Sequence, residues 1–342
     1  MKAMLLREYN NSLVLEDLDD PCPLEDEVIV KVRGAGMCYT DIKIVTGQLS
    51  KFIKLPHIPG HEIAGEIVET GKNVKSLKPG QKGVVYSIIG CGDCIYCRSG
   101  KENLCINTRR IGFEENGGFA EYVKLPAYNF CPFESSIPFE KMAVLPDAVG
   151  TPYHAFKKIA NPAAGQYVLI VGAGGLGIHA VQLAKQKGAF VIVCDIKDDS
   201  LKLAEKYGAD TCFNINNKND VVKDIFDITK GTGADIILEG VGSEATFAWS
   251  INCLKKGGTL IVMGYDPVNK IPVSFIDMHN NEWKIAGTKI TTKQDLLEVI
   301  ELVDNGIIDP VVTKVISLSE VNEGLDLVRN HKIPGRVSIA NY

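Results

Sequence analysis

The stretch YVLIVGAGGLGIHAVQLAKQKGAFVIVCD, residues 167–195, decides the fold of this chain. Its apolar start, 167–172, predicts a strand. The periodicity of 176–188 predicts a helix, and the apolar run 190–195 predicts a second strand. A strand, a crossover helix and a strand in this order form a βαβ unit, whose two strands pair in parallel.

The turn between the first strand and the helix is rich in glycine. Gly172, Gly174 and Gly177 have the spacing G-x-G-x-x-G, with Gly175 and Leu176 between the last two. Such glycines permit a tight turn, a close approach of a pyrophosphate and close contact between helix and strand. The amino end of the helix adds partial positive charge for phosphates. A dinucleotide site is therefore expected here, and the alternative is a glycine-rich turn in another α/β fold.

Asp195 ends the second strand, about 20 residues after the glycines, where the dinucleotide fingerprint has an acidic residue. A carboxylate at this place accepts hydrogen bonds from both ribose hydroxyls. It would also repel a 2′-phosphate, since both groups are negative. The sequence therefore predicts NAD(H) as the cofactor rather than NADP(H).

The pattern of the βαβ unit continues on its carboxyl side. Further apolar runs predict four more strands, and segments with helical periodicity lie between the runs. Six strands with helical crossovers predict a doubly wound parallel sheet. The strands are expected at 211–215, 235–240, 259–264 and 283–288, and two of the helices at 199–208 and 243–256.

The two ends of the chain have a different character. Alternating or apolar runs with glycine and proline between them predict a β-rich first part, and the tail predicts two helices and a strand. A length of 342 residues is sufficient for two domains. The expected strands are 28–36, 62–71, 82–89 and 119–126, and the expected tail elements are helices near 292–305 and 319–331 and a strand at 335–341.

Four cysteines lie within CGDCIYCRSGKENLC, with the spacing C-x2-C-x2-C-x7-C. They are Cys91, Cys94, Cys97 and Cys105. Gaps of two residues allow neighbouring thiolates to reach one ion, so we expect a closed, structural zinc site. Two disulfides or an iron–sulfur cluster are the alternatives, although the motif lacks the ferredoxin gap of three residues and the proline after its last cysteine.

Composition excludes several classes of function. The net charge of −5 and the absence of a basic block argue against nucleic-acid binding. The first residues contain no apolar segment typical of a signal peptide, and no apolar run is long enough to cross a bilayer. We therefore expect a soluble cytoplasmic protein with a small-molecule substrate and no membrane partner.

A second set of candidate metal ligands lies in the first part of the chain. The segment GMCYTD contains Cys38, Thr40 and Asp41, and PGHEIAGE contains His61 and Glu62. Cysteine and histidine are zinc ligands, but a catalytic zinc site usually has three protein ligands and a water. Taken singly, each residue is better explained without a metal, Cys38 as a buried thiol and His61 as a hydrogen-bonded loop histidine.

Together these motifs resemble the zinc-dependent medium-chain alcohol dehydrogenases over essentially the whole chain. The resemblance rests on the Cys-x-Thr-Asp segment, the GHE segment, the four cysteines and the glycine turn followed by Asp195. It implies an α/β protein with a catalytic domain around a GroES-like β-barrel at 1–148, a Rossmann domain at 149–288 and a return to the catalytic domain at 289–342. It also implies two zinc ions per chain and NAD.

The resemblance further implies a role for each residue of the catalytic site. Cys38 and His61 hold the catalytic zinc, and Asp147 is the expected third ligand, with Glu62 as the alternative. Thr40 takes the proton of the alcohol and Asp41 orients His61.

The same resemblance extends to the cofactor. It places Thr151 near the nicotinamide, Val241, Val262 and Gly287 in loops that line the cofactor, and Arg336 on the pyrophosphate. Many relatives have a relay histidine three residues after the threonine, whereas this chain has Lys43.

The expected activity is the reversible, NAD-dependent conversion of an alcohol to an aldehyde or ketone. Polyol, amino-alcohol or L-threonine dehydrogenase chemistry is the alternative within the same class. A protein that binds NAD and zinc as a sensor without turnover is the alternative from another class. By resemblance, the protein is expected to be a homotetramer or a homodimer.

Overall fold

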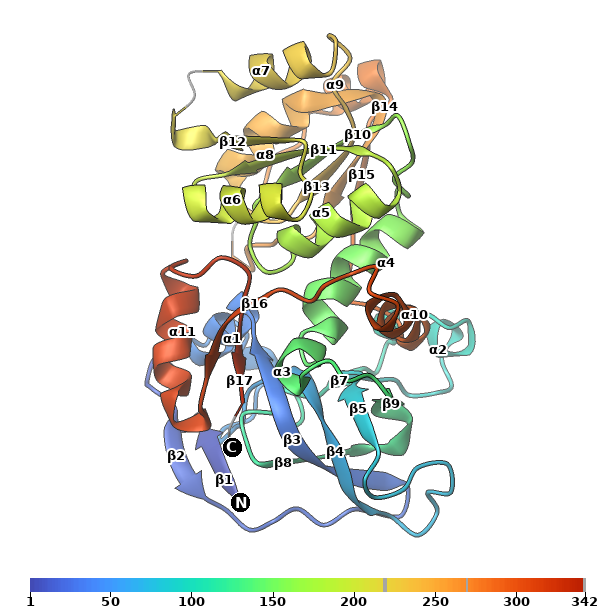
Figure 1. Cartoon of the computed structure of the whole chain (residues 1–342), viewed down its shortest axis with the longest axis vertical. Coiled ribbons are helices and arrows are strands. Elements are labelled where there is room, and N and C mark those ends of the chain that lie inside the picture. Colours follow the sequence, from blue (N-terminus) through green and yellow to red (C-terminus); the bar gives the residue numbers. More distant parts are fainter. Residues whose placement is uncertain (218–219, 269, 341–342) are drawn as a thin grey trace. The chain divides into compact units, whose positions relative to one another are not determined.

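The computed structural model describes residues 1–217, 220–268 and 270–340, which form two compact units (Figure 1). The first unit comprises Met1–Gly150 and Thr291–Tyr342, and the second comprises Thr151–Ile290. The expected domain boundaries lie two residues before these divisions. Every helix among the described residues is too short or too polar to cross a lipid bilayer.

The second unit contains the predicted doubly wound sheet, which is confirmed. Its six strands all pair in parallel, and their order reverses direction between β10 and β13. Ligands of such sheets bind at the carboxyl ends of the strands beside this switch point. In spatial order the strands are β12 (Thr211–Asn214), β11 (Phe190–Asp195), β10 (Tyr167–Val171), β13 (Ala234–Glu239), β14 (Leu254–Val262) and β15 (Lys284–Gly287).

Helices α5 to α9 connect these strands, and α4 precedes the first of them. The helix α5 buries eight consecutive residues beginning at Gly177. The helix expected at 243–256 is shorter than predicted, because Leu254 already pairs with Ala234 in the sheet. The helices are α4 (Gly150–Lys158), α5 (Gly177–Gln186), α6 (Asp198–Lys206), α7 (Val221–Ile228), α8 (Glu244–Ser250) and α9 (Phe275–Asn281).

The first unit is built on a seven-stranded, mainly antiparallel sheet. Its longest strand, β3, pairs with β4, β8 and β17, and the side chains between them form a large apolar core. The strands are β3 (Glu27–Met37), β4 (Glu62–Thr70), β5 (Lys82–Val85), β8 (Tyr122–Pro126), β9 (Phe130–Pro132), β16 (Val312–Ile316) and β17 (Arg336–Ile339).

Smaller elements complete the first unit. The strand expected at 82–89 is divided, because β5 pairs with β4 and β9 whereas β6 pairs with β7. The elements are β1 (Lys2–Leu5), β2 (Val14–Asp17), β6 (Ile88–Ile89), β7 (Arg109–Arg110), α1 (Tyr39–Val45), α2 (Ile95–Arg98), α3 (Phe139–Met142), α10 (Lys293–Asp304) and α11 (Val321–Arg329).

Three strands of the first unit bring the candidate site together. β3 ends at Met37, directly before Cys38, and β4 begins directly after His61. In the antiparallel register Gly36 faces Glu62, and Met37 faces the second residue of β17. The carboxyl end of β3 and the amino ends of β4 and β17 therefore meet at one edge of the sheet.

Candidate metal centres and cofactor site

Three buried side chains of the first unit converge on one point. The Cys38 thiol, one ring nitrogen of His61 and one carboxylate oxygen of Asp147 all lie within 4.8 Å of one another. Cys38 precedes α1, His61 precedes β4, and Asp147 lies in a π-helical turn, Leu145–Val149, just before α4. Such turns occur frequently at functional sites.

Asp41 holds both Cys38 and His61. Its Oδ2 accepts a hydrogen bond from the Cys38 backbone N–H at 2.8 Å, and its Oδ1 lies 3.3 Å from His61 Nδ1. The other ring nitrogen of His61 is 3.7 Å from Asp147 Oδ2. Burial acts to lower the pKa of His61, but the negative charge of Asp41 and the neighbouring side chains of Asp147 and Cys38 raise it well above its usual value.

The helix α1 also carries Thr40 and Lys43. Thr40 Oγ1 is 3.5 Å from Cys38 Sγ, so the hydroxyl lies beside a candidate ligand. Lys43 is buried, and its ammonium lies 5.9 Å from the centre of the Tyr39 ring. The residue that replaces the relay histidine of many relatives is thus held against an aromatic side chain.

Glu62 and Arg336 form the buried wall of the same site. Arg336 Nη2 lies 2.8 Å from Glu62 Oε1 and 2.9 Å from Asp147 Oδ2. Burial raises the pKa of Glu62 to about 8, although the charge of Arg336 opposes this shift. Among the described residues, the group of convergent ligand atoms contains Asp147 and not Glu62.

The donor set of Cys38, His61 and Asp147 fits a zinc ion. Thiolate, imidazole and carboxylate are the three ligand types that zinc accepts, and three protein ligands leave one position for a substrate or water. All three side chains are buried, and buried polar groups of this kind are ordinarily paired or bound to a metal.

The four cysteines of the loop form a second, closed centre. Their sulfur atoms all lie within 4.8 Å of one another, and those of Cys91 and Cys97 are 4.0 Å apart. Tetrahedral zinc with Zn–S distances of about 2.3 Å requires sulfurs about 3.8 Å apart. All ten cysteines of the chain are free, which excludes the disulfide alternative.

Backbone amides prepare this loop for thiolates. The N–H of Cys91 donates to Cys105 Sγ at 3.3 Å, and the N–H of Cys94 donates to Cys91 Sγ at 3.4 Å. Hydrogen bonds from the backbone N–H groups of Cys97 and Ile106 lower the pKa of the Cys94 thiol to about 6. Donors to the charged form favour the thiolate, which is the form that binds metal.

The glycine turn of the second unit has room for a ligand. A side chain at Gly177 would collide with the Gly172 carbonyl oxygen at 1.9 Å, and Gly172 itself has a φ of +90°. At Gly174, by contrast, no described atom lies within 4 Å of the Cβ position. The first and last glycines therefore shape the turn, and the middle one leaves space above it.

Two buried residues that the sequence analysis did not single out support the glycine turn and the loop after β13. The ring Nδ1 of His179, in α5, lies 2.7 Å from the Gly175 carbonyl oxygen. Glu239, at the end of β13, accepts hydrogen bonds from Gly242 N–H and the Thr246 hydroxyl, both at 2.8 Å. The acidic residue that ends the strand before the glycines of EGVG is a signal that could have identified Glu239.

Asp195 connects the glycine turn to the next strand. Its Oδ2 accepts from the Ala173 N–H at 2.7 Å, and its Oδ1 accepts from the Lys197 N–H at 2.9 Å. Each carboxylate oxygen has two lone pairs, so each can accept one more hydrogen bond. The carboxylate thus lies beside the turn and can accept from two hydroxyl groups.

The other expected cofactor residues of this unit lie at strand ends or at its boundary. Val241 follows β13, and one of its methyl groups lies 2.9 Å from the Cβ position of Gly172. Val262 ends β14 and pairs in register with Glu239. Thr151 is buried at the start of α4. The glycine turn and the loops after β13 and β14 are therefore neighbours at the switch point of the sheet.

The fold and the two candidate metal centres together define a zinc-binding dehydrogenase with a dinucleotide-binding unit. Residues 24–135 match the family model described as the alcohol dehydrogenase GroES-like domain, and residues 175–305 match the one described as zinc-binding dehydrogenase. The chain belongs to the zinc-dependent medium-chain alcohol dehydrogenase family.

Individual relatives agree with this assignment. A NAD-dependent alcohol dehydrogenase of Sulfolobus acidocaldarius is 38% identical over 98% of both chains. The crystal structure of an alcohol dehydrogenase from Aeropyrum pernix matches with a TM-score of 0.93 and 34% identity, over 99% of this chain and 100% of that one. An L-threonine 3-dehydrogenase of Pyrococcus horikoshii is 36% identical over 80% of this chain and 78% of its own.

Proposed function

We propose that the protein catalyses the reversible, NAD-dependent oxidation of an alcohol to an aldehyde or ketone. The observation that carries this proposal is the convergence of Cys38, His61 and Asp147 in a buried site, with Thr40 beside it. The relatives named as NAD-dependent alcohol dehydrogenases support the same conclusion.

Each residue of the metal centre has a defined part in this reaction. Cys38, His61 and Asp147 would hold a zinc ion, which acts as a Lewis acid on the alcohol oxygen. The charge of Asp41 keeps His61 Nδ1 turned away from the ion and raises the basicity of the ring. Thr40 Oγ1 receives the proton of the substrate hydroxyl. The convergent group that contains Asp147 and not Glu62 supports Asp147 as the third ligand.

The residues of the second unit would hold NAD, which accepts the hydride. Gly172, Gly174 and Gly177, with Gly175 and Leu176, form the turn for the pyrophosphate. Asp195 binds the two ribose hydroxyls. Thr151, Val241 and Val262 are proposed for the nicotinamide end. The resemblance gives Arg336 to the pyrophosphate, whereas in this structure its side chain is buried against Glu62 and Asp147 in the first unit.

The domain assignment is part of the same proposal. Residues 1–148 and 289–342 form the GroES-like catalytic domain, and 149–288 form the Rossmann domain. The two compact units of the structure, divided at Gly150 and Ile290, support it.

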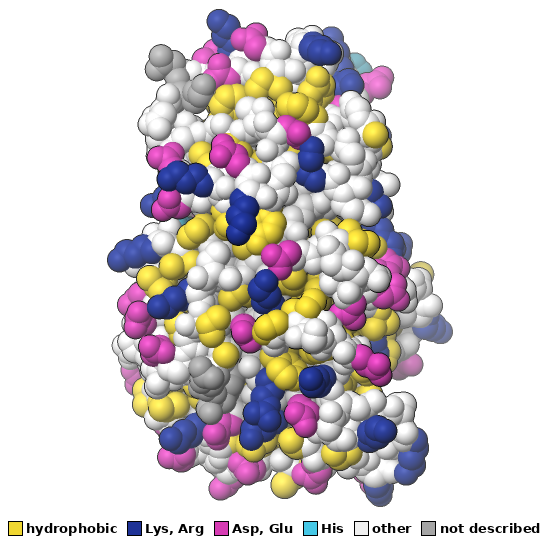
Figure 2. Space-filling view, in the orientation of Figure 1, with side chains coloured by type: hydrophobic (Ala, Val, Ile, Leu, Met, Phe, Trp, Pro, Cys, Tyr) yellow, Lys and Arg dark blue, Asp and Glu magenta, His cyan; other side chains and the backbone are white. Residues whose placement is uncertain are grey.

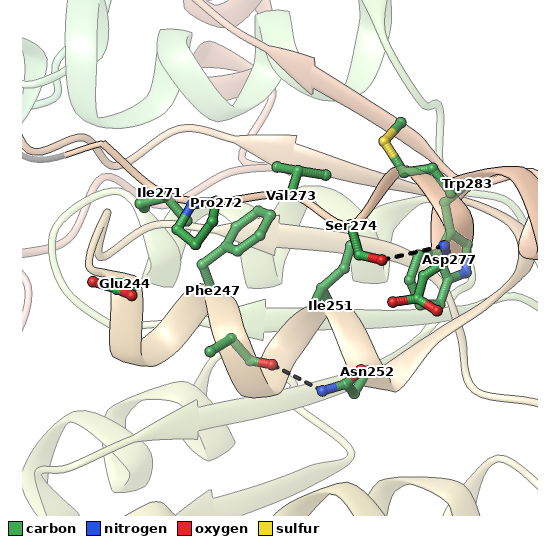
Figure 3. Close-up of a pocket in the computed structure, with 12 residues that line it drawn as sticks. Glu244, Phe247, Ile251, Asn252, Ile271, Pro272, Val273, Ser274, Asp277 and Trp283 are labelled. Carbon is green, nitrogen blue, oxygen red and sulfur yellow. Dashed lines mark hydrogen bonds between the residues drawn. The ribbon is translucent and has the colours of Figure 1, made fainter.

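We also propose that the protein assembles as a homodimer or homotetramer through its second unit. β15 lies at an edge of the six-stranded sheet, and an unpaired edge can pair with a second copy. Three apolar side chains nearby in sequence are strongly exposed, with 75% of Val268, 84% of Phe275 and 63% of Ile276 accessible. Figure 3 shows a pocket of the same unit, between α8 and the segment that leads into α9.

Light scattering tests the assembly. The wild type is expected to have two or four times the mass of one chain, and Phe275→Ser should shift the protein toward the monomer. Exposed Tyr128→Ser, in the first unit, is the matched control. A monomeric wild type would contradict the proposal.

A cytoplasmic location and a small-molecule substrate complete the proposal. All ten cysteines are free, which suits a reducing compartment. Acidic and basic side chains are intermixed over the visible face of the molecule (Figure 2), and the net charge is −5, so a nucleic-acid partner is not expected.

A substrate screen tests the activity. Primary and secondary alcohols, polyols and amino alcohols, including L-threonine, are offered with NAD and with NADP, and the reduced cofactor is measured. Simple alcohols with NAD should give the highest kcat/KM. Cys38→Ser should abolish turnover, whereas Cys22→Ser, at an exposed thiol, should not change it. A preference for L-threonine or a polyol selects the alternative substrate class, and binding of NAD without any turnover selects the sensor.

A further inference from the structure

An aromatic ring packs against the candidate zinc ligand His61. The centre of the Phe113 ring lies 5.3 Å from that of His61, at an angle of 49° between the planes. Phe113 is 4% exposed, so its position is set by neighbouring protein atoms. His61 is therefore held by Asp41 at its Nδ1 and by Phe113 at its ring.

The contact with Asp41 is not sufficient by itself to orient the imidazole of His61. The two atoms are 3.3 Å apart, and in the described part of the chain neither Asp41 Oδ1 nor His61 Nδ1 has a hydrogen bond of good geometry. Their attraction is that of charges, which depends on distance far more than on direction. Packing against the Phe113 ring adds a second constraint on the orientation of His61.

Arg110 fixes Phe113 in turn. The guanidinium carbon lies 4.1 Å from the centre of the Phe113 ring and 4.6 Å from that of Phe52. Arg110 Nε donates to one carboxylate oxygen of Glu114 at 3.0 Å, and Nη2 donates to the other at 2.7 Å. Two aromatic rings and a bidentate carboxylate thus leave the guanidinium little freedom.

The backbone of this turn is pressed against the segment that carries His61. A Cβ atom at Gly112 would lie 2.6 Å from the Gly60 carbonyl oxygen and 3.0 Å from His61 Cβ. His57 Nε2 lies 3.1 Å from the Gly112 carbonyl oxygen. A displacement of the turn is therefore passed directly to His61.

We propose that Phe113 is a positioning residue for His61, and that Phe52, Arg110 and Glu114 form a clamp that holds Phe113 in place. This inference rests on the proposed function, because it takes His61 as a ligand of the catalytic metal. The clamp acts through shape, since Glu114 balances the charge of Arg110. Groups that orient a metal-bound histidine typically change metal affinity about 10–100-fold when they are altered.

Three variants separate shape from charge. Arg110→Leu removes the clamp, and Arg110→Lys keeps the charge but loses the planar, bidentate geometry. Phe113→Leu keeps an apolar side chain but loses the flat ring. Arg109→Leu is the matched control, because Arg109 pairs with Glu115 at 2.7 Å on the same turn but is exposed.

The experiment uses the full chain loaded with metal at both centres. Release of each metal to excess EDTA is followed with time, and the absorption bands of Co²⁺ placed in the catalytic centre report its geometry. All three variants should release the catalytic metal about 10-fold faster or more, with altered Co²⁺ bands, and should lower kcat more than they raise KM. The metal of the four cysteines should be released at the wild-type rate, which shows that the variants are folded.

Different results would overturn different statements. Wild-type release and wild-type Co²⁺ bands in Phe113→Leu or in Arg110→Leu would overturn the inference and leave the proposed function intact. Full recovery in Arg110→Lys would overturn the role of shape. A wild-type protein that binds metal only at the four cysteines would overturn the proposed function itself.

Discussion

Arg336 Nη2 lies 2.9 Å from Asp147 Oδ2, and both side chains are buried. The same nitrogen is 2.8 Å from Glu62 Oε1, so one guanidinium contacts two carboxyl groups inside the first unit. A cation bound at Asp147 would neutralise part of the negative charge that Arg336 otherwise balances. The charge of the metal centre and the position of Arg336 are therefore coupled.

Arg336→Gln should destabilise the metal-free protein strongly. Loss of one partner from a buried ion pair costs about 3–5 kcal/mol, because it leaves an uncompensated charge. In the zinc-loaded protein the loss should be smaller, since the ion lies beside Asp147. Denaturant unfolding of both forms measures the difference.

The exposed pair of Arg109 and Glu115 is the control for Arg336. Arg109→Gln should cost less than about 1 kcal/mol in either form, as surface pairs do. Equal losses for Arg336→Gln with and without zinc would contradict the coupling.

Two zinc ions are expected per chain. Cys97→Ser should remove one of them together with much of the thermal stability, because the loop folds around its ion. Cys38→Ser should remove the other with nearly all activity but a smaller loss of stability. Metal analysis of the pure protein checks this, and a single tight site in the wild type would show the expectation to be wrong.

Asp147→Asn should weaken the catalytic zinc and leave the structural zinc in place. An amide is a poorer zinc ligand than a carboxylate, and the change also removes the partner of Arg336. Glu62→Gln should retain both ions. Metal content and turnover of the two variants decide the assignment, which belongs to Glu62 if the outcomes are reversed.

Asp195→Ser should relax the preference for NAD, mainly through KM. Charge-assisted hydrogen bonds are worth about 1.5–3 kcal/mol each, and the variant also ends the repulsion of a 2′-phosphate. Lys197, two residues further on, can then meet that phosphate. Steady-state kinetics with both cofactors measure the change.

The structure adds a control for Asp195, whose carboxylate also accepts two backbone N–H groups. Asp210, the residue directly before β12, is a comparable acceptor, because its carboxylate accepts a hydrogen bond from the Val191 N–H at 2.7 Å. Asp210→Ser removes this acceptor. It should cost stability without changing cofactor preference. A wild type that prefers NADP would overturn the interpretation of Asp195 but not the fold.

His57 should make the protein less stable below neutral pH. Burial lowers the pKa of this side chain, so the folded state binds its proton less readily than the unfolded state, whose pKa is about 6.5. Its effect is small well above pH 6.5, grows by at most about 1.4 kcal/mol per pH unit as the pH falls from 6.5 toward the folded pKa, and levels off below the folded pKa. Between pH 7.5 and 5.5, the free energy of unfolding measured in urea should fall more for the wild type than for His57→Gln. Equal decreases in the two proteins would refute this.

The features that the sequence predicted are mainly those that depend on residues close together along the chain. The glycine turn lies inside one βαβ unit, and the four cysteines lie within 15 residues, 91–105. Short-range chain geometry fixes such arrangements, so spacing predicted the glycine turn and a metal site in the loop, and alternating apolar runs and helical segments predicted the doubly wound sheet. Strand positions followed from apolar runs, whereas the end of α8 did not, because pairing of Leu254 in the sheet overrode helical periodicity.

The catalytic centre depends on tertiary structure. Asp147 and Arg336 are 189 residues apart, and only the register of β3 with β4 and β17 brings the segments of Cys38, His61 and Arg336 to one edge. The contact of Phe113 with His61 likewise requires the folded turn beside Gly60. The sequence by itself determined the ligand types and the family. Their mutual distances, the sharing of Arg336 and the clamp around Phe113 were decided by the tertiary structure, because contacts between distant segments depend on sheet register and burial rather than on spacing along the chain.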